Sequence, residues 1–163
     1  MGEAQLQQAL VELGFIGEAI DDTSGHHYAA GERFLDLLTF LGCSPVINLS
    51  AEDGDAYCFI ELLSYEQPTF LHGSQSFQPR CRHCREPIPN WRDQIQASSP
   101  ITCPSCGQAM SLSEVNWKQS AGYASQFVVV HNIYLHEAVP GEKLMTRLEG
   151  LTESKPWTYF YAL

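Results

Sequence analysis

The sequence predicts an α+β fold: a small mixed β-sheet of about four strands, with helices on one face, plus an inserted cysteine-rich segment. Its 163 residues and 44% apolar content suit one domain with a real core. Helix-like and strand-like hydrophobic patterns both occur on either side of that segment. We therefore expect a discontinuous α+β domain of residues 1–74 and 120–163, with residues 75–119 as an inserted subdomain.

Two helices are predicted in the N-terminal part, with residues 17–31 irregular between them. The first runs from Ala4 to Leu13 and ends at Gly14, which can adopt the left-handed conformation of a helix C-cap. The second runs from Glu32 to Leu41, because its apolar residues follow the i, i+3, i+4, i+7 rule. Those residues are Phe34, Leu37, Leu38 and Leu41.

Two strands follow, at residues 46–49 and 56–63, joined by the acidic turn 52–55. The Asp-Gly pair in that turn is typical of hairpins. The strand pattern breaks at Pro68, and we expect a linker beyond it.

The C-terminal part predicts strand, helix and strand, at residues 127–135, 139–148 and 157–162. A strand–helix–strand unit implies a crossover between parallel strands. Since the earlier hairpin is antiparallel, the sheet is expected to be mixed.

The cysteine-rich segment contains two C-x-x-C pairs: Cys81 with Cys84, and Cys103 with Cys106, separated by 18 residues. Two residues between cysteines let one turn direct both sulfurs at one metal ion, and two such turns complete a tetrahedron. Prolines at 79, 87, 89, 100 and 104 exclude long helices here.

This pattern resembles a zinc ribbon over residues 78–112. The resemblance implies one structural Zn²⁺ ion, since four cysteines leave no coordination position for a reacting water. An iron site with the same sulfur geometry and a dithiol redox pair are the alternatives. We expect so short a segment to lack an adequate core and to depend on the metal for folding. Arg85 occupies the position that Gly107 holds after the second pair, so the first turn is expected to be strained or differently formed.

Charge is unevenly distributed along the chain. Residues 77–118 carry five basic and three acidic residues, a net charge of +2. The remainder of the chain carries four basic and sixteen acidic residues, a net charge of −12. The acidic body argues against non-specific nucleic-acid binding by the whole protein. Arg82 and Arg85 could offset the charge of a zinc–thiolate centre, or they could contact a partner, with Trp91 stacking on a nucleic-acid base.

Histidines supply the remaining candidate chemistry. His131 is expected to be a hydrogen-bonded core residue, and His136 with Glu137 follows a strand end. His26 and His27 could hold a second metal or perform acid–base work, although a solvated loop is the simpler interpretation. His83, inside the first cysteine pair, is expected to be exposed. No recognisable catalytic motif occurs.

The sequence favours a cytoplasmic, non-enzymatic protein that acts through protein–protein contacts. No secretory signal or membrane span is expected, and Cys43 and Cys58 are predicted to be buried free thiols. One alternative is an enzyme or small-ligand binder with a pocket between sheet and ribbon, using His131, His136, Glu137 and the His26–His27 pair. The other is nucleic-acid binding through the basic ribbon. The sequence predicts no particular oligomeric state.

Overall fold

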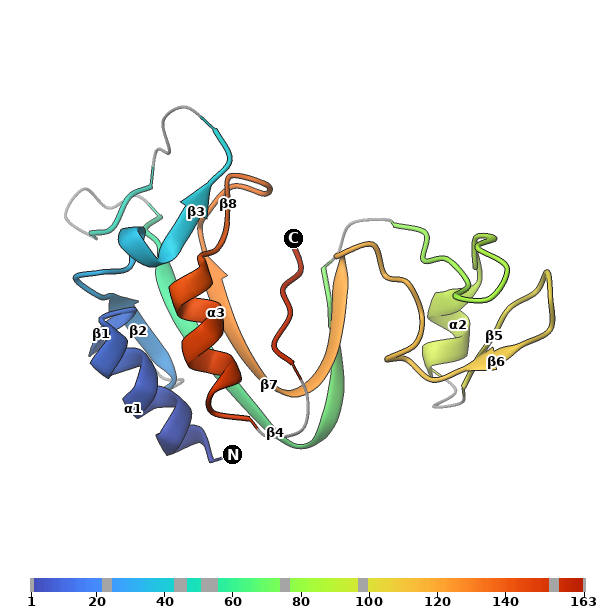
Figure 1. Ribbon diagram of the computed structural model, residues 1–163, viewed down its shortest axis with the longest axis horizontal. Helices are drawn as coiled ribbons and strands as arrows, with labels where there is room; N and C mark the ends of the chain where they lie inside the picture. Colours follow the sequence, from blue (N-terminus) through green and yellow to red (C-terminus); the bar gives the residue numbers. More distant parts are fainter. Residues whose placement is uncertain are drawn as a thin grey trace. The chain divides into compact units, whose positions relative to one another are not determined.

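The computed structural model describes residues 2–21, 25–42, 47–50, 56–73, 77–96, 100–152 and 156–162 (Figure 1). It divides into two compact units. The first comprises residues 1–66 and 125–159, and the second comprises residues 67–124 and 160–163. Each unit has its own cluster of buried apolar side chains. The limits expected for the inserted subdomain, 75–119, stay a prediction.

The principal sheet has four strands in the order β1-β2-β4-β7. Their bounds are Ile16–Ala19 (β1), His27–Ala30 (β2), Phe59–His72 (β4) and Ala121–His131 (β7). The predicted α+β class is confirmed, but the sheet is antiparallel and not mixed. The register of β2 and β4 places Tyr28 opposite Ile60, and His27 opposite Glu61. Because successive side chains point to opposite faces, these two pairs lie on different faces of the sheet.

Helices α1 (Glu3–Leu13) and α3 (Glu142–Glu149) cover one face of this sheet, as predicted. Both helices contribute leucines to the core of the first unit, and each fully buried leucine stabilises the fold by about 1.5–3 kcal/mol. The core residues from the helices and strands are Leu6, Leu10, Leu144, Leu148, Ile16, Tyr28, Ile60 and Leu62.

The end of α1 is fixed by glycine, as the sequence predicts. Gly14 adopts φ +76°, and its N–H group caps the carbonyls of Leu10 and Val11. The Gly14 carbonyl then accepts a hydrogen bond from the Arg33 N–H at 3.0 Å. Gly31 lies so close that a Cβ atom there would come within 2.3 Å of the Gly14 oxygen. The helix end and the end of β2 are therefore packed backbone against backbone.

Two predictions for residues 17–41 are wrong. Residues 17–31 were expected to be irregular, yet they contain most of β1 and all of β2. The helix expected over 32–41 is replaced by one 3₁₀ turn, η1 (Leu35–Leu37), and the strand β3 (Leu38–Phe40). The chain becomes extended at Leu38 because β3 pairs antiparallel with β8 (Ala138–Pro140). Phe34 and Leu37 still reach the core, which explains the helix-like spacing.

Other strand predictions need correction too. Residues 47–50 form no strand, and the turn 52–55 and residue 46 lie outside the described residues. The strand expected over 56–63 is β4, which continues through Pro68. The strand expected over 127–135 is β7, which begins and ends earlier. Residues 156–162 form no strand, so the predicted parallel crossover does not exist.

The second unit contains short elements around an aromatic core. They are α2 (Trp91–Gln96), β5 (Ile101–Thr102) and β6 (Ala109–Met110). Trp91 and Trp117 pack edge to face with ring centroids 5.4 Å apart, and their exposed fractions are only 1% and 7%. Both indole N–H groups are satisfied, by the carbonyls of Phe77 and Leu112. The expectation that this segment lacks a core is therefore wrong.

Candidate metal centre

The two cysteine pairs form matching backbone turns. In the first turn the Arg85 N–H donates to the Cys81 carbonyl at 3.0 Å, and in the second the Gly107 N–H donates to the Cys103 carbonyl at 2.9 Å. Arg85 adopts φ +65° and Gly107 adopts φ +72°. The first turn is thus formed like the second, and Arg85 takes on the left-handed conformation that glycine adopts without strain.

The four sulfurs converge on one point. All four Sγ atoms lie within 4.8 Å of one another, so they could hold one metal ion. Cys81 Sγ lies 3.7 Å from Cys106 Sγ, and Cys84 Sγ lies 3.6 Å from Cys103 Sγ. A tetrahedral zinc ion with Zn–S bonds of about 2.3 Å separates its sulfurs by about 3.8 Å. The donor set therefore fits such an ion.

The surroundings of the sulfurs combine core and solvent. Cys81 and Cys103 are 1% and 0% exposed and belong to the core of the second unit, whereas Cys106 is exposed. Cys81 Sγ also contacts Met110 Sδ at 3.8 Å. The backbone N–H of His83 reaches Cys81 Sγ at 3.3 Å, a contact typical of turns that stabilise a thiolate. The His83 side chain itself is exposed, as predicted.

The thiols strongly influence one another's ionisation. Burial raises the pKa of Cys103, but hydrogen bonds from the backbone N–H groups of Cys106 and Ser105, together with those from the Cys84 and Cys106 side chains, outweigh it, and the pKa falls to about 7. At Cys84, a bond from the Glu86 N–H lowers the pKa, while burial and the other three sulfurs raise it to about 12. Without a metal, the cluster thus favours ionisation of one thiol at the expense of its neighbours.

The arginines near the cluster are exposed, but the tryptophan is not. Arg82 and Arg85 are exposed, and the Arg80 guanidinium donates to the Arg85 carbonyl at 2.9 Å, which supports the left-handed turn. Trp91 packs against Phe77 and Trp117, and the Arg92 guanidinium lies 4.4 Å from its ring centroid. A ring that is 1% exposed cannot stack on a nucleic-acid base. The burial of Trp91 therefore gives no support to nucleic-acid binding through this residue.

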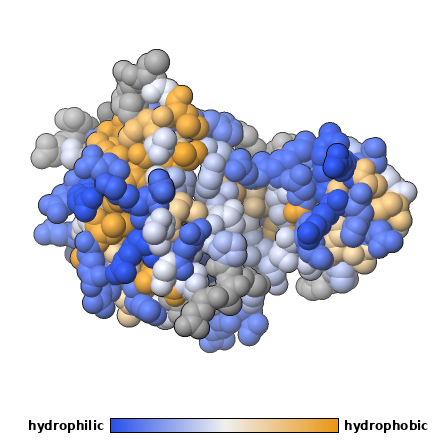
Figure 2. All heavy atoms as spheres, viewed as in Figure 1, coloured by the Kyte–Doolittle hydropathy of each residue, from blue (hydrophilic) through white to orange (hydrophobic). Residues whose placement is uncertain are grey.

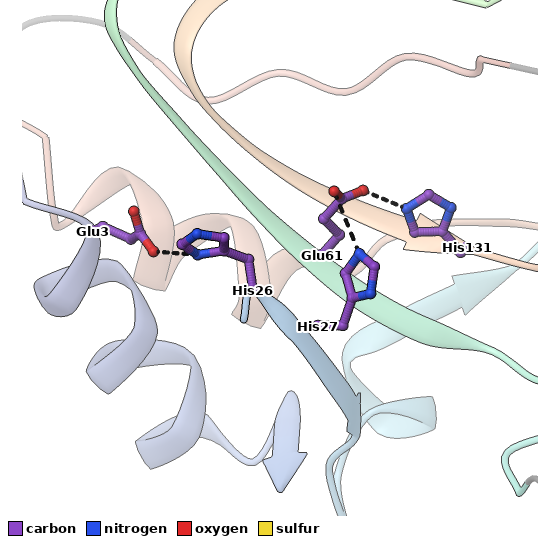
Figure 3. A network of polar contacts seen from close by, with 5 residues as sticks. All are labelled: Glu3, His26, His27, Glu61 and His131. Atoms are coloured by element: carbon purple, nitrogen blue, oxygen red, sulfur yellow. Dashed lines mark hydrogen bonds and ion pairs between the residues drawn. The ribbon is translucent and has the colours of Figure 1, made fainter. Parts of the chain in front are cut away.

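A second polar cluster lies on the principal sheet, in the first unit (Figure 3). Glu61 on β4 holds two histidines: its Oε2 atom lies 2.7 Å from His131 Nε2, and its Oε1 atom lies 3.4 Å from His27 Nε2. His26 points elsewhere and pairs with Glu3 at 2.8 Å. The sequence named all three histidines but missed Glu61, because only the register of β2 and β4 reveals it.

The remaining candidates do not join either cluster. His136 adopts φ +59° in the connection between β7 and β8, where it is exposed. Glu137 Oε2 accepts a bond from the Tyr134 N–H at 3.3 Å and so closes the same turn. Of the predicted histidine and glutamate candidates, only His27 and His131 converge.

Cys58 is a buried free thiol, as predicted, and burial raises its pKa to about 11. Cys43 lies outside the described residues. Among the described residues, no helix has both the length and the apolar character needed to cross a membrane.

Comparisons of the chain with protein-family models, with curated proteins and with solved structures give no match.

Proposed function

We propose that this protein is a zinc-ribbon-like binding protein. Cys81, Cys84, Cys103 and Cys106 hold one structural Zn²⁺ ion, and the protein acts through contacts with a protein partner and not through catalysis. The convergence of four sulfurs within 4.8 Å of one another carries this proposal. Four sulfur ligands close a tetrahedral coordination sphere, so the ion stabilises the fold and has no position for substrate.

Zinc is favoured over iron and over a redox disulfide on chemical grounds. The paired sulfurs, 3.6 and 3.7 Å apart, match the separation of ligands around one tetrahedral ion, whereas a disulfide requires about 2.05 Å. Zinc binds thiolates tightly and has no redox chemistry of its own, and the metal analysis below separates it from a mononuclear iron held by the same four sulfurs. Reduced thiols are required, so we propose a reducing compartment such as the cytoplasm.

An apolar patch on the first unit supports a protein partner. Figure 2 shows apolar side chains gathered over β3 and β8. Leu41, directly beyond β3, is 58% exposed, and Tyr134, in the connection between β7 and β8, is 76% exposed. The Leu41 N–H donates a hydrogen bond to the carbonyl of Glu137, in the same turn as Tyr134. Large exposed side chains of this kind, gathered in one place, are typical of protein-binding surfaces.

The metal part is tested by measuring bound metal in protein purified without added ions. We expect Cys84→Ser and Cys106→Ser to hold about one zinc per chain less than the wild type, and Cys58→Ser, the control, to hold as much as the wild type. A wild-type protein that retains iron, or that binds no metal when thiols are kept reduced, would disprove this part.

The binding part needs a separate experiment. Affinity capture with the wild-type protein is compared with capture by Leu41→Asp/Tyr134→Asp, which removes the apolar side chains without touching the core. We expect a specific partner to be lost with the double variant. A partner that binds both proteins equally would contradict the role of this patch but leave the zinc assignment intact.

A further inference from the structure

We propose that His27, Glu61 and His131 form a second metal site, which takes a divalent transition-metal cation such as Zn²⁺. This site is independent of the four cysteines, since all three residues belong to the first unit. The proposal does not rest on the function assigned to the cysteine cluster.

The sheet places the three side chains in one row. His27 on β2 lies directly opposite Glu61 on β4, and β7, which carries His131, is the neighbour of β4 on its other side. Neighbouring strands lie about 4.8 Å apart. The imidazoles on β2 and β7 can therefore both approach the carboxylate on β4, the strand between them. Figure 3 shows both Nε2 atoms directed at the Glu61 oxygens.

The row lies on the face opposite the core. Ile60 and Leu62, the neighbours of Glu61 in sequence, are buried beneath the helices, whereas Glu61 retains 22% of its side-chain exposure. The exposures of His27 and His131 are 22% and 35%. The site is therefore open to an ion from solvent, and its partial burial strengthens the attraction of the Glu61 carboxylate for a cation relative to bulk water.

An aromatic side chain holds the imidazoles in place. Phe59, two residues before Glu61 on the same face, stacks on His131 with ring centroids 4.4 Å apart and planes 12° from parallel. It also contacts His27, at 4.9 Å between centroids. These contacts keep both imidazoles beside Glu61 before a ligand binds, so less conformational entropy is lost in gathering the three side chains.

Two imidazoles and one carboxylate are ligands that zinc, copper, nickel and iron share. In this structure His131 Nε2 hydrogen-bonds the carboxylate at 2.7 Å and His27 Nε2 lies 3.4 Å from it, and the centroids of the two rings are 6.3 Å apart. Metal–nitrogen bonds of about 2.0–2.1 Å require the two nitrogens to come within about 4 Å of each other. Both rings must therefore turn inward, and each Nε2 atom must give up any proton it carries, to Nδ1 or to solvent, before it binds the metal. Water would complete the coordination.

Calorimetric titration of the holoprotein tests the proposal, with the cysteines already loaded with one equivalent of Zn²⁺. We expect a second equivalent to bind to the wild type. Glu61→Gln and His131→Gln should each weaken it at least about tenfold. His26→Gln is the matched control, because it removes the histidine of a separate histidine–glutamate pair, with Glu3.

Three results would overturn the proposal: no second equivalent in the wild type, unchanged binding in both Glu61→Gln and His131→Gln, or equal loss in His26→Gln. If the variants do not fold, NMR of the wild-type histidine ring nitrogens decides. We expect Zn²⁺ to shift His27 and His131 Nε2 before His26 and His72. Shifts that reach His26 or His72 first would place the ion elsewhere.

Discussion

At the residue scale, the two cysteine turns show how one backbone geometry is reached with different residues. The sequence identifies all four sulfurs, because C-x-x-C spacing is local and needs no tertiary information. It also identifies Arg85 as the departure from the pattern. From the sequence alone, Arg85 could make the first turn either strained or differently formed. The structure shows the same left-handed turn in both pairs, with φ +65° at Arg85 and +72° at Gly107.

Gly107→Ala tests that geometry. A Cβ atom in the left-handed region costs about 1 kcal/mol, and nothing lies within 4 Å to add a clash. We therefore expect the free energy of unfolding of the zinc-loaded protein to fall by about 1 kcal/mol in chemical denaturation. Arg85→Ala is the control: its backbone already carries a Cβ atom in this region, so the change should stay within about 0.5 kcal/mol. Equal losses in both variants would contradict this explanation.

At the scale of elements, prediction succeeded where a pattern is long and local. Helix α1 has an apolar stripe and a glycine stop, and both are visible in the chain. The segment 32–41 has the same stripe, yet Leu38 pairs with Pro140, a partner about a hundred residues away. Its three-residue strand is too short to leave a signal of its own. Glu61 was missed for a related reason, since its link to His27 and His131 depends on strand register.

Gly31→Ala tests the junction between α1 and β2. A Cβ atom there would lie 2.3 and 2.6 Å from the Gly14 oxygen and carbonyl carbon, and backbone cannot rotate away as a side chain can. We expect a loss of stability of about 1–3 kcal/mol, measured by denaturant unfolding. Gly42→Ala, with nothing within 4 Å of its Cβ, should leave stability nearly unchanged. A Gly31→Ala protein as stable as the wild type would show that the two segments are not in close contact.

At the scale of the whole molecule, two cores share one chain. The second unit was expected to depend on metal alone, but its tryptophans, Ile88, Ile101 and Met110 form a core that includes Cys81 and Cys103. Such a core cannot be recognised in a short, proline-rich segment, because the apolar residues that form it follow neither the helical nor the strand period. A metal ion held by the four cysteines would therefore stabilise a unit that also has apolar packing, and it would fix the turns at the edge of that core.

Chelation of the metal should affect the two units differently. We expect a chelator to expose the four cluster cysteines to iodoacetamide within the time in which Cys58 stays unmodified, as read by mass spectrometry. Cys58 serves as the internal reference, because its side chain is fully buried in the core of the first unit and stays shielded from the reagent while that unit is folded. Modification of Cys58 together with the cluster would mean that loss of metal unfolds the first unit as well.

The ligand set itself is the most direct test of the central proposal. X-ray absorption at the zinc edge of the protein loaded with one equivalent reports the number and type of ligand atoms. We predict four sulfurs at about 2.3 Å and no nitrogen or oxygen in the first coordination sphere. A sphere with three or fewer sulfurs, completed by a lighter atom, would contradict a closed structural site and leave a position for water or substrate.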